Sequence, residues 1–257
     1  MSQLQDEFYT WTVSYSFSVI IEGILLICFM PEILKHFFFR PIVIGIIASS
    51  FLCGFFGTIE KILMLTTGTL ANGLLGTFAS AFAIFGYYSM LSWVCCLAHL
   101  TTTYIKRADI NFDLLRNNYV SYSVTFPFFA TLVLYYATDG DNFLAAVQVG
   151  IGSISILDST TALSLALKYA PGLAASAYSI ATLFLLLNYN VNPSEEGPAP
   201  KYRKFNFFFY LLIFLMGPLS LHAIELLLGQ DPSPHLAVWE CASIPFVPVL
   251  LLIVVII

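Results

Sequence analysis

Charged side chains are scarce in this sequence. They make up 10% of the 257 residues, whereas a soluble domain carries about 25%. Apolar residues make up 59%, and the mean hydropathy is +0.86. No water-soluble fold could bury this much apolar surface, so we expect lipid to be the solvent. The composition excludes a soluble protein and predicts an all-α, polytopic transmembrane helix bundle in a single domain, 1–257.

The familiar motifs of catalysis and metal binding are also absent. The sequence contains no H-E-x-x-H, no G-x-S-x-G and no Walker loop. Its five cysteines lie in apolar runs without metal-ligand spacing, so we expect them to be buried and reduced. A net charge of −5 offers no basic footprint for nucleic acid. We therefore expect no enzyme, metal site, cofactor or nucleic-acid partner, but bound lipids.

Apolar runs of about 20 residues, the length of a transmembrane helix, predict six clear spans. They cover 13–30, 38–56, 74–102, 120–136, 205–228 and 236–257. The apolar region 142–190 has two interpretations. It forms two helices, 143–166 and 171–190, divided at the "APG" of 170–172, or a single helix, 164–190, after an apolar loop or re-entrant piece. The first interpretation gives eight spans and the second gives seven.

Basic residues favour the second interpretation. With seven spans, three connections fall on one face, and these hold eight of the ten cations. Cytoplasmic loops are enriched in Lys and Arg, so we predict seven spans with the N-terminus outside, and 193–204 as a short polar inner loop. These inner basic loops also suit a cytosolic partner. The cations that would meet it are Lys106, Arg107, Arg116, Lys201, Arg203 and Lys204, while Lys35 and Arg40 lie in the first inner connection.

Ionisable residues inside a span are costly and mark candidate functional sites. Glu22 lies in the middle of the first span. It is interpreted either as a protonated carboxyl bonded to a neighbouring helix or as a proton or ion site. His222 and Glu225 lie one turn apart, either as a partly solvated pair or as a ligand or proton-relay site. With Glu240, these residues form the candidate intramembrane polar site.

Small residues recur in three of the apolar segments, at 45–50 ("GIIASS"), 76–86 ("GTFASAFAIFG") and 172–177 ("GLAASA"). Small side chains allow transmembrane helices to approach closely. We therefore expect a tight bundle, with faces that also suit helices of other chains.

Three stretches resemble the frizzled and slime-mould cyclic-AMP-receptor type of seven-helix receptor. They are "FFFRPIVIGIIASSFLCGFFGTI" (37–59), "FGYYSMLSWVCCLAHLTTTYIKR" (85–107) and "VSYSVTFPFFATLVLYYATDGDN" (120–142). The first is similar to the first inner loop and second helix of such receptors, and the others to the third and fourth helices. The resemblance implies a receptor-like bundle that couples an outer ligand to an inner partner.

The sequence thus leads to three functional hypotheses. The favoured one is a non-catalytic accessory or structural subunit of a larger membrane complex, such as one of an energy-transducing membrane. The alternative is the receptor-like protein, and the third is a small transporter or channel that uses Glu22 and the His222–Glu225 pair. The expected partners are membrane lipids and other membrane-protein subunits. The membrane is either an organellar inner membrane or the plasma membrane.

Overall fold

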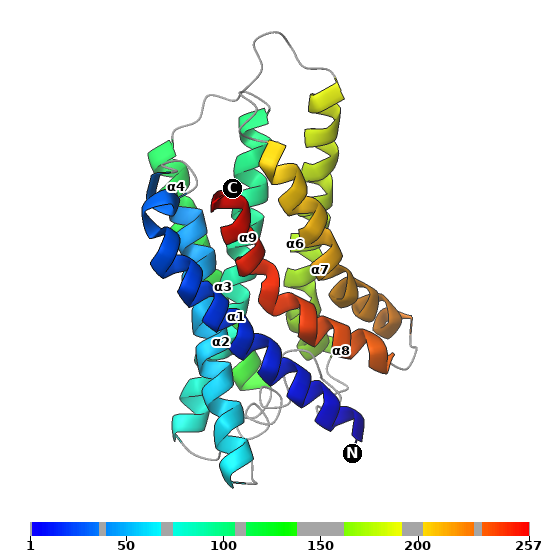
Figure 1. Cartoon of the computed structure of the whole chain (residues 1–257). Coiled ribbons are helices and arrows are strands. Elements are labelled where there is room, and N and C mark those ends of the chain that lie inside the picture. Colours follow the sequence, from blue (N-terminus) through cyan, green and yellow to red (C-terminus); the bar gives the residue numbers. More distant parts are fainter. Residues whose placement is uncertain are drawn as a thin grey trace.

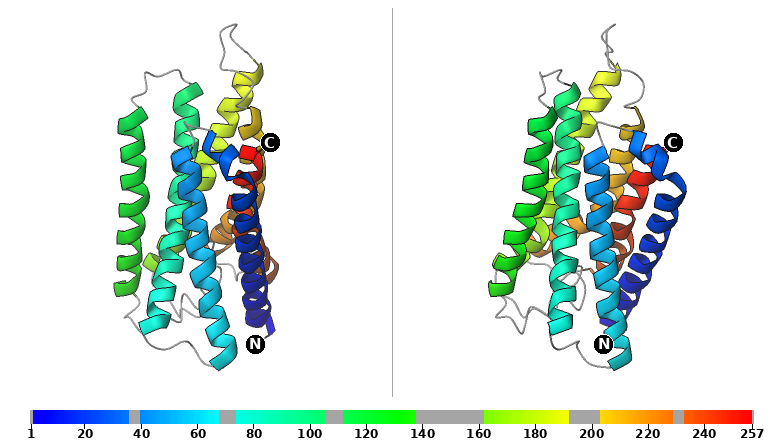
Figure 2. Two further views of the ribbon diagram at one scale, coloured as in Figure 1. Left: turned by 60° about the vertical axis from the view of Figure 1, so that its left-hand side comes forward. Right: turned by 90° about the vertical axis from the view of Figure 1, so that its left-hand side faces the viewer.

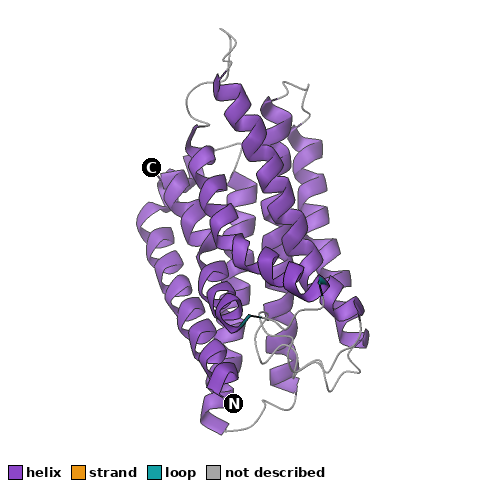
Figure 3. Cartoon of the chain, turned by 90° about the vertical axis from the view of Figure 1, so that its right-hand side faces the viewer, coloured by secondary structure: helices purple, strands orange, loops and turns teal. Residues whose placement is uncertain are grey.

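The computed structural model describes residues 2–35, 40–67, 74–105, 112–137, 162–191, 203–228 and 233–256. Nearly all of these residues are helical (Figure 3), so the all-α prediction is confirmed for the described part of the chain. The helices are α1 (Ser2–Lys35), α2 (Arg40–Thr67), α3 (Leu74–Ile105), α4 (Phe112–Ala137), α6 (Ala162–Val191), α7 (Arg203–Leu227), α8 (Pro234–Ser243), the 3₁₀ helix η3 (Ile244–Phe246) and α9 (Val247–Ile256).

Three stretches of these helices are long and apolar enough to cross a membrane: Arg40–Ile59 in α2, Phe78–Thr103 in α3 and Tyr169–Asn188 in α6. Thr12–Cys28 in α1 and Phe208–Pro218 in α7 are shorter apolar stretches. These lengths suit a membrane bundle, because about 20 residues of helix span the hydrocarbon core.

Helix α1 places polar residues inside the bundle and apolar residues outside. Ser14, Ser18 and Glu22 are buried at intervals of four residues. Its exposed face is an apolar stripe at alternating intervals of three and four residues, namely Val13, Phe17, Ile20, Ile24 and Ile27. A surface helix of a soluble protein has the opposite arrangement. The outer face of α1 therefore suits contact with lipid.

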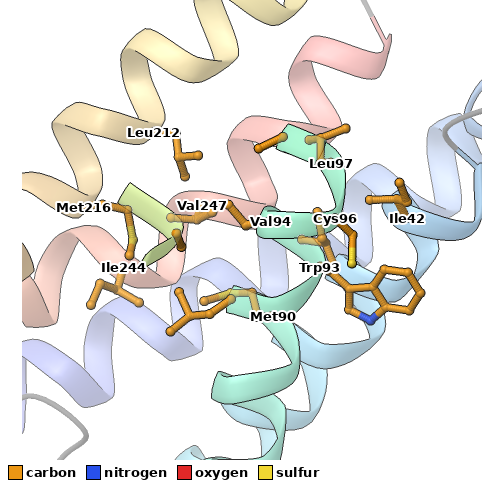
Figure 4. Close-up of a cluster of buried hydrophobic side chains, with 14 of the residues drawn as sticks. Ile42, Met90, Trp93, Val94, Cys96, Leu97, Leu212, Met216, Ile244 and Val247 are labelled. Carbon is orange, nitrogen blue, oxygen red and sulfur yellow. The ribbon is translucent and has the colours of Figure 1, made fainter. Parts of the chain in front are cut away.

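Helix α3 is the central helix of the bundle. In its apolar stretch 78% of the residues are buried, against 50% in α2 and 39% in α6. It packs on α2, α4 and α6. Figure 4 shows α3 residues in one buried cluster with side chains of α2, α7, η3 and α9, including Met90, Val94, Leu97, Ile42, Leu212, Met216, Ile244 and Val247.

The pairing of α2 with α3 confirms the close packing predicted from small residues. A Cβ on Gly86 of α3 would lie 2.6 Å from the backbone nitrogen of Cys53 and the carbonyl oxygen of Ser49 on α2. A Cβ on Gly45 of α2 would lie 2.2 Å from the indole of Trp93. Glycine at these positions lets the two helices approach to a distance that no side chain permits.

The last apolar segment differs from its prediction. The sequence predicts one continuous span over 236–257, but the structure interrupts it with η3 between α8 and α9. Pro245 lies within η3 and Pro248 is the second residue of α9. Proline has no N–H and its ring clashes with the preceding turn, so the pair breaks the α-helical ladder at this point.

The region 142–190 is described only from residue 162 onward. There α6 continues through Pro171, so the alternative interpretation of two helices divided at 170–172 is wrong. The one-helix interpretation, 164–190, matches α6 closely. The alternative course of 143–161 lies outside the described residues.

Candidate functional site

Glu22 is completely buried among helices. Its Oε1 accepts hydrogen bonds from Ser50 Oγ of α2 at 2.8 Å and from Ser18 Oγ, one turn earlier on α1, at 2.9 Å. Ser18 Oγ also contacts the carbonyl oxygen of Pro245 in η3. The buried Oε2 of Glu22 has no hydrogen-bond partner in the described part of the chain. Glu22 therefore lies where α1, α2 and the break in the last segment meet.

The spacing of Ser18, Glu22, Ser49 and Ser50 along their helices explains this arrangement. Ser18 and Glu22 are four residues apart, so they lie on the same face of α1. On α2, the adjacent Ser49 and Ser50 of "ASS" point about 100° apart. Ser50 reaches α1, while Ser49 reaches Ser89 on α3, with 2.9 Å between the two Oγ atoms. The serine pair thus links α2 to both of its neighbours.

A polar path continues from Ser89 to α4. Ser89 Oγ donates a 2.9 Å hydrogen bond to the carbonyl oxygen of Ser123. In a regular helix the N–H at position 127 would donate to that carbonyl, but residue 127 is proline and has no N–H. The freed carbonyl therefore gains its donor from α3. Together these hydrogen bonds link helices α1, α2, α3 and α4 across the bundle.

A second polar cluster joins α3, α4 and α6 toward the end of α3 and the start of α4. His99 Nδ1 lies 2.5 Å from the hydroxyl of Tyr119, and the ring of Tyr178 lies 6.3 Å from the His99 ring. One turn away, Thr102 and Thr182 are 3.1 Å apart through their hydroxyls. These contacts link the three helices.

Of the four predicted site residues, the structure describes the side chains of Glu22 and Glu225, and these two lie apart. Glu22 is buried beside α2 and η3, whereas Glu225 lies near the end of α7, where its Oε2 accepts a 3.0 Å hydrogen bond from the N–H of Ser233. No described contact joins these two carboxyl groups. The side chains of His222 and Glu240 lie outside the described residues.

The predicted basic loops lie partly in helices. Arg116 is the fifth residue of α4, Arg203 and Lys204 begin α7, and Lys35 and Arg40 end α1 and begin α2, so these cations lie at helix ends. The helices extend beyond the apolar spans because nothing in 112–119 or at 203–204 breaks them. Lys106, Arg107, Lys201 and most of the loop 193–204 lie outside the described residues.

The helix ends nevertheless gather the described cations. Figure 1 shows that the ends of α1, α3 and α6 and the starts of α2, α4 and α7 lie at its upper end. Five cations belong to these helix ends: Lys35, Arg40, Arg116, Arg203 and Lys204. The other two described cations, Lys61 and Lys168, lie near the end of α2 and the start of α6, which are at the opposite end.

Sequence reasoning missed Ser18, Ser50 and Pro245 as neighbours of Glu22. The signals available were the four-residue spacing of Ser18 and Glu22 and the two prolines of "IPFVP" at 244–248. Cys28, expected to be buried, is exposed, since it lies on the outer side of α1. The other described cysteines, Cys53, Cys95 and Cys96, are free and buried or half-buried, as predicted.

A buried carboxyl group that accepts hydrogen bonds from two serine hydroxyls can bind a proton or a cation. In the described part of the chain no three His, Cys, Asp or Glu side chains gather as metal ligands. Comparison with known proteins identifies no family model that matches the chain and no curated protein related to it.

Proposed function

We propose that the chain is a non-catalytic, multi-pass membrane protein with seven crossings that works as a subunit of a larger membrane assembly. The seven crossings are α1, α2, α3, α4, α6, α7 and the broken segment α8–η3–α9. The gathering of cationic helix ends at one end of the bundle supports a cytosolic position for that end.

The observation that carries the proposal is the position of α4. It packs mainly on α3 and to a lesser extent on α6, and both views of Figure 2 place it at the edge of the bundle. Its outward face carries four exposed polar residues, Asn117, Asn118, Ser121 and Thr125. They share this face with large exposed aromatic side chains such as Phe128 and Phe129.

Polar side chains on a lipid-facing helix favour association with another helix. Asn, Ser and Thr form hydrogen bonds between transmembrane helices and are enriched at their contacts. Asn118, Ser121 and Thr125 recur at intervals of three and four residues, so they lie along one side of α4. The occupant of this α4 face is then a transmembrane helix of another subunit.

The test is native-gel migration of the endogenous tagged protein after mild detergent extraction, with mass spectrometry of the band. We expect a large, reproducible assembly that is lost when Asn118→Leu is combined with Ser121→Ala and Thr125→Val. Asn188→Leu is the matched control, because Asn188 is an exposed asparagine near the end of α6. Migration of the wild-type protein as a monomer contradicts the proposal.

A receptor-like function is the second candidate, supported by the cluster of His99, Tyr119 and Tyr178. This cluster joins three helices close to the cation-rich end, where an inner partner would bind. The resemblance of three stretches to seven-helix receptors points the same way. A receptor predicts surface delivery, migration as a monomer or small oligomer, and an inner partner lost on charge reversal at Arg107 and Arg116.

A further inference from the structure

No positive charge in the described part of the chain compensates the buried carboxyl group of Glu22. No basic side chain contacts it in the part of the chain that the structure describes, and its Oε2 lacks any hydrogen-bond partner there. An isolated buried carboxylate is costly because it loses its hydration, and a neutral carboxyl costs much less. The arrangement therefore favours Glu22 with a proton bound over the ionised group.

The position of Ser18 gives this proton a structural consequence. Its Oγ lies within hydrogen-bond reach of two acceptors, Glu22 Oε1 and the Pro245 carbonyl oxygen. A serine hydroxyl has only one proton to donate. When Glu22 is ionised, Ser18 and Ser50 both donate to the carboxylate, and the Pro245 carbonyl is left without this donor. When Glu22 is protonated, its O–H can donate to Ser18 Oγ, and Ser18 can donate to Pro245.

We propose that Glu22 is a proton-binding site whose protonation switches the Ser18 hydrogen bond onto the Pro245 carbonyl, and so controls the contact between α1 and the break in the last segment. The proton comes from the aqueous phase and forms the O–H bond on Oε1; no other covalent bond changes. Ser50 continues to donate to the carboxyl group in both states. Release of the proton loosens η3 from α1, because the carbonyl freed from its donor must find water.

The setting of this switch is characteristic of coupling sites in membranes. Backbone carbonyls at interrupted transmembrane helices are where transporters bind protons and small cations. Here the interruption is η3, and Pro245 presents the carbonyl. Glu22 is the only carboxyl group in the apolar stretch Thr12–Cys28 of α1.

The other titratable groups near Glu22 are few. Tyr15 on α1 and Cys53 on α2 bond to each other at 3.4 Å. Of the elements packed on α1, η3 and α9 carry no titratable side chain, and α8 carries His235, Glu240 and Cys241. The remaining charged residues of both helices lie about ten or more residues away, which is roughly 15 Å along the helix axis. On α1, counted from Glu22, they are Asp6, Glu7, Glu32 and Lys35. On α2, counted from Ser50, they are Arg40, Glu60 and Lys61.

The first test is infrared difference spectroscopy of the full chain in lipid vesicles, titrated from acidic to alkaline buffer. We expect the C=O band of a protonated buried carboxyl to disappear on titration in the wild type, and to be absent throughout in Glu22→Gln. Glu240→Gln is the control that assigns the band, since Glu240 is the other carboxyl near the break. If Glu22→Gln does not fold, Glu22→Asp keeps a carboxyl group and should shift the band.

The second test measures the contact itself. Spin labels at Ile27→Cys on α1 and Ile253→Cys on α9, both exposed positions, are introduced with Cys28→Ser. We expect the distance between them to change with pH in the wild type and to stay at its acidic value in Glu22→Gln. Ser18→Ala should lose the change while the carboxyl band still titrates. Ser16→Ala, which removes a hydroxyl that donates to the Thr12 carbonyl within α1, should behave as wild type.

Three outcomes overturn the proposal. A Glu22 band that never titrates identifies a permanently neutral structural carboxyl. A distance change that persists in Ser18→Ala shows that Ser18 does not transmit the proton's effect. Loss of the band on addition of sodium at constant pH identifies a cation site in place of a proton site.

Discussion

Ser89 of α3 donates its hydroxyl to the carbonyl of Ser123, the backbone group that Pro127 leaves without a helical partner. The proline and the serine lie on different helices but depend on each other. The proline frees an acceptor inside the bundle, and an unsatisfied buried acceptor is costly. The serine supplies the missing donor, so the gap in the hydrogen-bond ladder of α4 also becomes a link to α3.

This dependence predicts a coupled response. Ser89→Ala should lower the stability of the wild type by about 0.6 to 1.5 kcal/mol, the range for such bonds. In a Pro127→Ala background it should cost close to nothing, because the restored N–H of residue 127 can satisfy the Ser123 carbonyl. A double-mutant cycle of unfolding in detergent micelles measures the difference. Equal costs in the two backgrounds would show that the two residues are independent.

The close approach of α2 and α3 predicts a strong effect of a single methyl group. Gly86→Ala places a Cβ 2.6 Å from α2 backbone atoms, which cannot move aside as a flexible side chain can. We expect a loss of about 1–3 kcal/mol, typical of overpacking. Gly217→Ala on α7 is the control, since nothing lies within 4 Å of its Cβ. Thermal unfolding of both variants makes the comparison, and a stable Gly86→Ala would contradict this packing.

The Gly45–Trp93 contact predicts a rescue. Gly45→Ala alone should destabilise the bundle, because its Cβ would lie 2.2 Å from the Trp93 ring. Trp93→Leu removes that ring and creates space, so the double variant should lose less than the sum of the single losses. The same unfolding measurement gives the coupling energy. Additive losses would mean that the clash is relieved by another route.

The His99–Tyr119 hydrogen bond predicts a difference between two tyrosines of α4. Tyr119→Phe removes the hydroxyl that lies 2.5 Å from His99 Nδ1 and should cost about 0.5–1.5 kcal/mol. Tyr122→Phe should change stability little, because Tyr122 is half exposed and stacks on Phe126 through its ring. If both variants unfold at the same temperature, the hydrogen bond contributes nothing to the stability of this end of the bundle.

The orientation in the membrane is open to a labelling test. Leu114→Cys, near the start of α4, and Leu228→Cys, just after α7, both replace exposed side chains. In a Cys28→Ser background, we expect a membrane-impermeant maleimide added to intact cells to label position 228 directly. Position 114 should require permeabilisation, since it lies at the cation-rich end. The reverse pattern would invert the proposed topology.

Sequence reasoning reached the helical class and the close packing of small residues because both depend on composition and spacing along one helix. It also identified Glu22, since a carboxyl in an apolar run is costly wherever the helix packs. It did not find Ser50 or Pro245, because spacing defines a helix face but not the helix opposite. The η3 break was missed although both prolines were visible, since the surrounding run is apolar enough to suggest a continuous span.

The distribution of prolines separates two helices that we expect to be rigid from helices that can bend. Helix α3 contains none, and α2 has one only at its second residue, Pro41, where a helix tolerates it. The long helices around this pair each have one inside: Pro31, Pro127, Pro171 and Pro218. The α2–α3 pair is thus expected to be rigid, whereas the helices around it can bend at their prolines. We expect its amides to exchange with solvent hydrogen last, and slow motions of the protein to be bending of the surrounding helices against it.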